Sequence, residues 1–91
     1  MYFVYLIITK IKKRTISYVG YTNNIKKRIK IHNSSKGAKF TKGKKWKLIY
    51  FKTYDNKITA MKEEYKLKKN YKLRNKIKLK NNDKNFYSTT L

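Results

Sequence analysis

The chain of 91 residues contains no cysteine and a single histidine. It therefore cannot form a disulfide, use a thiolate nucleophile or bind zinc through cysteines, and one histidine also excludes histidine-rich zinc sites. Aspartate and glutamate together number only four. Nuclease centres that hold two metal ions need several converging carboxylates, which this chain cannot supply.

Long hydrophobic runs are also missing. The apolar start, residues 2–8, is far shorter than the roughly 20 residues that a membrane helix needs. It has no basic segment before it and no small-residue cleavage site after it, as a secretory signal would. We therefore expect an intracellular protein, in the cytoplasm or with the chromosome.

Positive charge is what the chain has in excess, with 26 lysines and arginines and a formal charge of +22 at pH 7. A compact domain with this charge repels itself, and binding a polyanion relieves that repulsion while releasing counterions. A membrane surface is a second polyanion, but the basic residues are spread along the whole chain and not gathered on one amphipathic helix. Nucleic acid is the expected partner.

The apolar pattern predicts an α+β domain. Residues 2–9 and 15–21 read as a β-hairpin and residues 46–54 as a third strand, all rich in β-branched and aromatic side chains. Helices are expected from the capping residues 22–24 to about 33, over 58–70 and over 72–80, with a basic surface loop at 34–45. The order of elements predicts a small antiparallel sheet flanked by about three helices in residues 1–80. Residues 81–91 are expected to be a flexible tail.

One acidic residue, Glu64, has an unusual position. Projected on a helix, it lies inside the apolar stripe, whereas Glu63 falls at the edge. The residues that share the stripe are Ala60, Met61, Leu67 and Tyr71. A buried carboxylate costs several kcal/mol unless it is paired or binds a metal. Glu64 is therefore either in a salt bridge with Arg28 or a lysine, or a ligand of one divalent cation completed by water and phosphate.

Arg28 and His32 are four residues apart, so they share a face of the first helix, and both can donate to a phosphate. The alternative is a structural histidine beside a solvated arginine. Tyr5 and Tyr18 lie on the two hairpin strands, where most tyrosines only pack in the core. A phenol with its usual pKa near 10 is a weak base at pH 7, but nearby lysines, Arg28 or a metal ion would favour its anionic form.

Five ordered segments resemble the GIY-YIG endonuclease superfamily, particularly its small stand-alone members. FVYLI at 3–7 resembles the first half-motif, with Phe-Val in place of Gly-Ile, and YVG at 18–20 resembles the second. NNIKKRIKIH at 23–32 resembles the helix that carries the family's arginine and histidine. KGAKFTKGKKWKLIYF at 36–51 resembles the loop and strand of the small branch, and AMKEEYKLKK at 60–69 the helix of the metal-binding glutamate.

The resemblance implies hydrolysis of a DNA phosphodiester with one Mg²⁺ or Mn²⁺ ion. Tyr5 or Tyr18 would help to deprotonate water, and Arg28 would stabilise the charged transition state. Glu64 would hold the metal, and His32 would transfer a proton or orient a tyrosine.

Lysines of the glycine-containing loop are expected to bind the DNA backbone without reading bases. They are Lys36, Lys39, Lys42, Lys44 and Lys45. We expect weak sequence preference, selectivity for branched or damaged DNA, or a protein partner for targeting. The alternative is a basic nucleic-acid-binding module without catalysis, or a nuclease fold that has lost activity, because either would explain the charge equally well.

Overall fold

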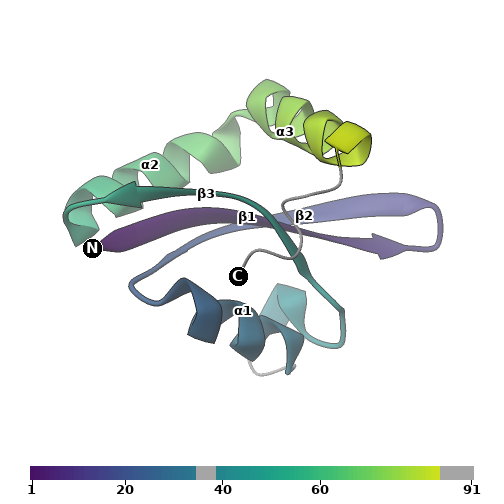
Figure 1. Ribbon diagram of the computed structural model, residues 1–91, viewed down its shortest axis with the longest axis horizontal. Coiled ribbons are helices and arrows are strands. Elements are labelled where there is room, and N and C mark those ends of the chain that lie inside the picture. Colours follow the sequence, from purple (N-terminus) through teal and green to yellow (C-terminus); the bar gives the residue numbers. More distant parts are fainter. Residues whose placement is uncertain (35–38, 85–91) are drawn as a thin grey trace.

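The computed structural model describes residues 1–34 and 39–84, and it confirms the predicted α+β fold with a three-stranded antiparallel sheet (Figure 1). The elements in chain order are β1 (Tyr2–Ile11), β2 (Arg14–Thr22), α1 (Ile25–Asn33), the short 3₁₀ helix η1 (Lys39–Thr41), β3 (Lys47–Tyr54), α2 (Lys57–Lys69) and α3 (Tyr71–Lys84). Each predicted strand and helix is therefore present at the expected place in the chain.

Strand β1 is the centre of the sheet, whose order is β2-β1-β3. Residues 4–9 of β1 are all buried. A strand that is covered on both faces needs a continuous apolar run in place of alternation, and this is the composition that β1 has. The pairing of β1 with β3 shifts register between Leu6 and Ile7, whereas its pairing with β2 is regular.

The sheet separates two cores. On one face, Val4, Leu6 and Ile8 of β1 pack with Ala60 and Leu67 of α2. The residues of the other core are Tyr5 and Ile7 of β1, Ile25 of α1, Trp46 and Leu48. Figure 1 shows the corresponding layers, with α1 on one side of the sheet and α2 and α3 on the other. Because side chains alternate along a strand, Tyr5 belongs to the α1 side.

Asparagines begin the three α-helices found in residues 1–34 and 39–84. The side-chain oxygens of Asn24, Asn56 and Asn70 accept backbone hydrogen bonds at the starts of α1, α2 and α3, at 3.2, 2.8 and 3.1 Å. Each oxygen satisfies one of the N–H groups that a helix start leaves without a partner. The capping residues expected from the sequence at 22–24 thus include Asn24, which caps α1.

Helix α3 is longer than expected, because it ends at Lys84 and not near residue 80. Asn81, the first residue of the predicted tail, is buried within it. Residues 85–91 of that tail lie outside the described residues, so its flexibility stays a prediction. Among the helices of the described segments, none combines the length and the apolar character that a membrane span requires.

Candidate active site

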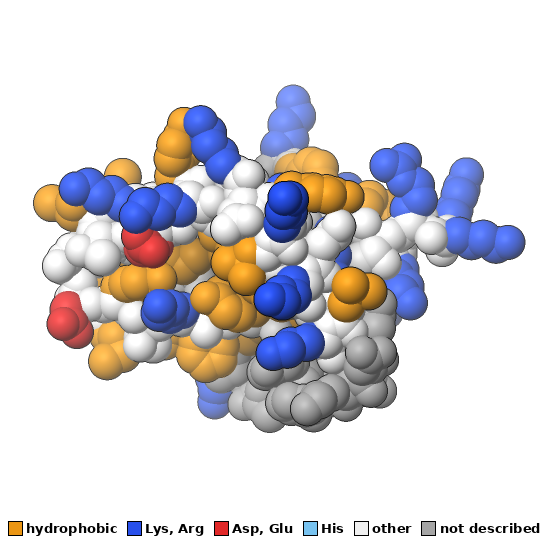
Figure 2. Space-filling model, turned by 90° about the horizontal axis from the view of Figure 1, so that it is seen from above, with side chains coloured by type: hydrophobic (Ala, Val, Ile, Leu, Met, Phe, Trp, Pro, Cys, Tyr) orange, Lys and Arg blue, Asp and Glu red, His pale blue; other side chains and the backbone are white. Residues whose placement is uncertain are grey.

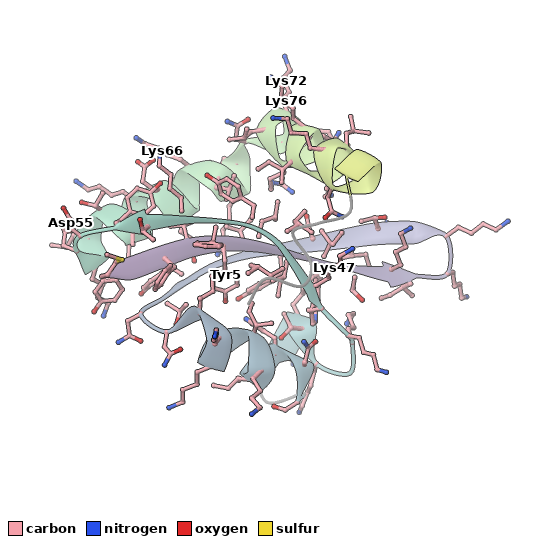
Figure 3. The ribbon with its side chains drawn as sticks, viewed as in Figure 1. Tyr5, Lys47, Asp55, Lys66, Lys72 and Lys76 are labelled. Carbon is pink, nitrogen blue, oxygen red and sulfur yellow. The ribbon has the colours of Figure 1, made fainter. Side chains whose placement is uncertain are left out.

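A buried hydrogen-bonded chain links β1, α1 and η1. The hydroxyl of Tyr5 lies 2.7 Å from Nε2 of His32, and Nδ1 of His32 lies 2.9 Å from Oγ1 of Thr41. All three side chains are almost completely buried, and Figure 3 shows Tyr5 on the α1 side of the sheet. Because both hydroxyls can donate or accept, each neutral tautomer of the imidazole is fully satisfied.

Burial controls the protonation of this chain. It raises the pKa of Tyr5 to about 12, although hydrogen bonding to Arg28 and the charge of Arg28 act in the opposite direction. It also lowers the pKa of His32 to about 4, and the charge of Arg28 adds to that decrease. At pH 7 Tyr5 is therefore protonated and His32 is neutral. Arg28 favours the phenolate, as the sequence predicted, but desolvation of Tyr5 outweighs it.

Gly20 makes room for the Tyr5 ring. The two residues are directly opposed in the pairing of β1 with β2. A Cβ atom at Gly20 would lie 2.6 Å from Cζ of Tyr5 and closer still to its hydroxyl oxygen. The glycine of the YVG segment is therefore required by packing, and any side chain there would displace the hydroxyl that bonds His32.

An aromatic cluster covers the outer side of His32. The ring centroid of Tyr18 lies 5.2 Å from that of His32, 6.1 Å from that of Phe40 and 6.3 Å from that of Trp46. The indole N–H of Trp46 donates to the carbonyl of Thr41 at 2.9 Å, which fixes η1 against the start of β3. Thr41 is thereby held in place to bond His32.

A polar pocket of about 430 Å³ opens beside this chain. Its lining residues are Tyr2, Tyr5, Tyr18, Gly20, Tyr21, Thr22, Asn23, Arg28, Lys57 and Glu64. It joins α1 and α2, which lie on opposite faces of the sheet, at the edge formed by β2. The pocket brings together Tyr5, Tyr18, Arg28 and Glu64 of the predicted catalytic set. The fifth, His32, is fully buried and does not line it, so His32 acts on the pocket only through its neighbours.

Glu64 is mostly buried, with a side chain 16% exposed, and its Oε1 lies 3.6 Å from Nζ of Lys68. The salt bridge expected from the sequence is therefore made with a lysine. Arg28, the other expected partner, lines the same pocket. The apolar stripe around Glu64 is narrower than expected, because Met61 and Tyr71 are exposed. Tyr71 begins α3 instead of continuing α2, so the helical projection does not apply to it.

The donor set around Glu64 fits one divalent cation. In residues 1–34 and 39–84, no three His, Cys, Asp or Glu side chains gather into a group that could hold a metal. Mg²⁺ nevertheless binds through one or two carboxylates when waters and phosphate oxygens fill its other positions. The ion pair of Glu64 with Lys68 is long and half exposed on the lysine side. Lys68 can therefore turn toward solvent when a metal ion compensates the charge of Glu64 in its place.

The predicted phosphate-binding lysines have different surroundings. Lys36 lies outside the described residues, and Lys39, Lys42 and Lys45 are exposed. Nζ of Lys44 donates to the carbonyls of Phe40 and Lys42 at 3.0 and 3.4 Å, so its ammonium helps to hold the turn at η1.

Lys57, the first residue of α2, lines the pocket although the sequence did not single it out. Cations are unfavourable at a helix N-terminus because of the helix dipole. The first turn of α2 also contains no acidic residue to offset this lysine. That unfavourable placement was the signal in the sequence that could have drawn attention to Lys57.

Residues 1–78 match the family model of the GIY-YIG catalytic domain. The chain belongs to this family. The match covers both half-motifs, α1, α2 and most of α3. This GIY-YIG domain is therefore the catalytic domain of a nuclease superfamily, and the resemblance identified in the sequence is confirmed.

Three curated relatives are similar to this GIY-YIG chain over part of their length. The UPF0213 protein CPE1444 of Clostridium perfringens is 47% identical over 62 residues, which cover 67% of this chain and 66% of that protein. The UPF0213 protein OB0043 of Oceanobacillus iheyensis is 39% identical over 64 residues, 69% of this chain and 73% of that protein. The UPF0213 protein YazA of Bacillus subtilis is 47% identical over 49 residues, 53% and 50% respectively. The chain thus aligns with about two thirds of the first relative and half of the third. No solved structure matches the chain significantly.

Replacing Gly20 by alanine is expected to destabilise the fold by about 1–3 kcal/mol, because the new Cβ overpacks the Tyr5 ring. Urea unfolding would measure the loss. The same substitution in a Tyr5→Ala background is the control, since the ring it clashes with is then absent. Equal costs in the two backgrounds would show that the clash with Tyr5 is not the cause.

The free energy of unfolding is expected to fall by about 2–3 kcal/mol between pH 6.5 and 4.5. The unfolded chain protonates His32 near its ordinary pKa of 6.5, whereas burial lowers the pKa of the folded form to about 4. The stabilisation is therefore complete above pH 6.5 and is lost as the pH falls. Urea titrations across this range would measure it. His32→Gln should be less stable at pH 7 but nearly independent of pH in this range, and a matching slope in that variant would contradict the assignment.

Proposed function

We propose that the protein is a DNA endonuclease that hydrolyses a phosphodiester bond with one divalent cation. Membership of the GIY-YIG family gives the nuclease class and a nucleic-acid substrate in general. The observation that supports this proposal for the present chain is that Arg28, Glu64 and two tyrosines line the same pocket. A binding module without catalysis has no need of a mostly buried carboxylate in the same pocket as an arginine.

The surface charge supports a polyanionic substrate. Figure 2 shows lysine and arginine side chains projecting from the face that carries α2 and α3, with few acidic groups among them. Lys66 and Lys72 point away from the sheet in Figure 3. Contacts of this kind bind phosphates without reading bases. They support a nuclease with little sequence specificity, whose selection of branched or damaged DNA would depend on DNA shape or on a partner.

Arg28 and Glu64 would act on the scissile phosphate from opposite sides of the pocket. The guanidinium of Arg28 would donate to the non-bridging oxygens and stabilise the charge that develops on them. Glu64 would hold a Mg²⁺ or Mn²⁺ ion. When bound, the ion supplies Lewis-acid stabilisation of the charge on the leaving oxygen.

Either Tyr5 or Tyr18 would accept the proton of the attacking water. Tyr5 can pass its own hydroxyl proton to His32, because Nε2 of His32 lies 2.7 Å from the hydroxyl oxygen. Burial lowers the pKa of His32 to about 4, so the ring is neutral at pH 7 but a weak base. It would hold the proton only while negative charge develops on the attacking water beside Tyr5. The hydroxyl of Tyr5 can then take a proton from water as it passes its own to His32, so no free phenolate is needed.

Time-resolved cleavage of supercoiled and branched DNA tests the proposal, with Mg²⁺, with Mn²⁺ and with EDTA. Glu64→Ala is expected to lower the cleavage rate by at least about 100-fold while DNA binding is retained, because the metal ligand is lost. Glu63→Ala is the matched control, since Glu63 is the adjacent carboxylate, pairs with Lys66 at 3.1 Å and does not line the pocket. Binding without cutting on every substrate and with both metals would identify a binding module or an inactive nuclease fold.

Lys57→Ala is expected to weaken DNA binding and to reduce the slope of log K against log salt by about one, because one phosphate contact is lost. Cleavage at subsaturating DNA should fall in parallel. Lys62→Ala is the control, because Lys62 is an exposed lysine of the same helix that does not line the pocket. Equal effects of the two substitutions on cleavage would remove Lys57 from the site.

A further inference from the structure

Phe40 has an unusual position for a phenylalanine. It lies in the middle of η1 and is 50% exposed. Its ring stacks on that of Tyr18, with centroids 6.1 Å apart and an interplanar angle of 20°, and lies 6.2 Å from the ring of Trp46. An aromatic ring that is supported on one side and open to solvent on another offers an apolar surface to a flat ligand.

Lysines flank Phe40 in the chain, and one of them lies close to its ring. Lys39, Lys42 and Lys45 are exposed in the same short segment, residues 39–45. The ammonium of Lys44 lies 5.5 Å from the centre of the Phe40 ring. The chemistry of the site therefore combines a flat apolar surface with cations, which fits a ligand that is aromatic and anionic at once. A nucleobase joined to its phosphate has both properties.

The platform is continuous with the pocket and is held rigidly. Tyr18 stacks on Phe40 and also lines the pocket that contains Arg28 and Glu64. Behind it, the indole of Trp46 bonds the carbonyl of Thr41, and the amide of Asn33 donates to the carbonyl of Trp46 at 3.1 Å. Little conformational freedom remains to be lost when a ligand stacks here, and such preorganisation favours binding.

We propose that Phe40 is a stacking platform for an unpaired nucleobase of the substrate, next to the pocket. Bases inside a duplex are already stacked on one another and paired, so they cannot cover the ring without being extruded. The site therefore favours nucleic acid with unpaired nucleotides near the pocket, such as a single strand or a flap. The position of this stacking site next to the bond that is cleaved rests on the proposed nuclease function. The binding of a base by Phe40 does not depend on that function.

Binding of labelled single strands in EDTA tests this inference by fluorescence anisotropy. One strand carries ordinary bases, and a second of equal length carries abasic-site analogues, so that both present the same phosphates. The quantity compared is the ratio of the two affinities. Wild type is expected to prefer the strand with bases by about fivefold or more, as stacking of a single base would give.

Phe40→Ala should abolish this preference and leave the salt dependence of binding unchanged, because the phosphate contacts remain. Phe40→Tyr should keep the preference, since the ring is kept. Phe51→Ala is the matched control, because Phe51 is 41% exposed on β3, packs on Phe3 at 5.9 Å and does not line the pocket. Circular dichroism and thermal unfolding establish that each variant is folded.

Three results would overturn the stacking site. They are a wild type without base preference, a Phe40→Ala variant that keeps the preference, and a loss that Phe51→Ala reproduces. Because no metal is present, cleavage does not enter the measurement. A protein that shows the predicted base preference but never cuts DNA would contradict the nuclease proposal and leave the stacking site standing. A protein that cuts DNA without that preference would contradict the stacking site and leave the nuclease proposal standing.

Discussion

The hydrogen bond between the hydroxyl of Tyr5 and Nε2 of His32 is the contact on which the rest of the site depends. It joins the central strand to α1 in the interior, where an unpaired partner would cost about 1–3 kcal/mol. Each end imposes a requirement: Gly20 must lack a side chain for the ring of Tyr5 to fit, and Thr41 must reach the far nitrogen of His32. The position of η1 therefore depends on β1, because Tyr5 of β1 bonds His32 and His32 bonds Thr41 of η1.

The small number of acidic residues is the second feature that determines the surroundings of the pocket. With four carboxylates against 26 basic side chains, a mostly buried glutamate is surrounded by candidate partners. The pairing of Glu64 with Lys68 is long and lies within one helix, so it leaves the face of the carboxylate toward the pocket available to another cation. The excess of basic side chains therefore also supplies a counter-charge for Glu64, which would otherwise be buried without compensation.

The strands and the helices were predictable because their signals are local. The four proposed catalytic residues that line the pocket were predicted mainly from the resemblance of five ordered segments to one family. A β-branched run, an asparagine before a helical period, or a glutamate among apolar neighbours can be recognised within ten residues. Gly20 and Thr41 could not be understood in this way, since their roles depend on the register of two strands and on a contact nine residues away from His32. Of the roles expected for His32, direct donation to a phosphate does not fit its complete burial, whereas orientation of a tyrosine fits its hydrogen bond to Tyr5. Helical spacing gives the direction of a side chain but not its depth.

The three α-helices of the described segments start on asparagine and not on aspartate. A neutral amide satisfies the free N–H groups without cancelling the partial positive charge of the helix start. The surface near each cap therefore has the same sign as the lysines around it. A phosphate group lying at one of these helix starts would therefore meet partial positive charge and not a repelling carboxylate.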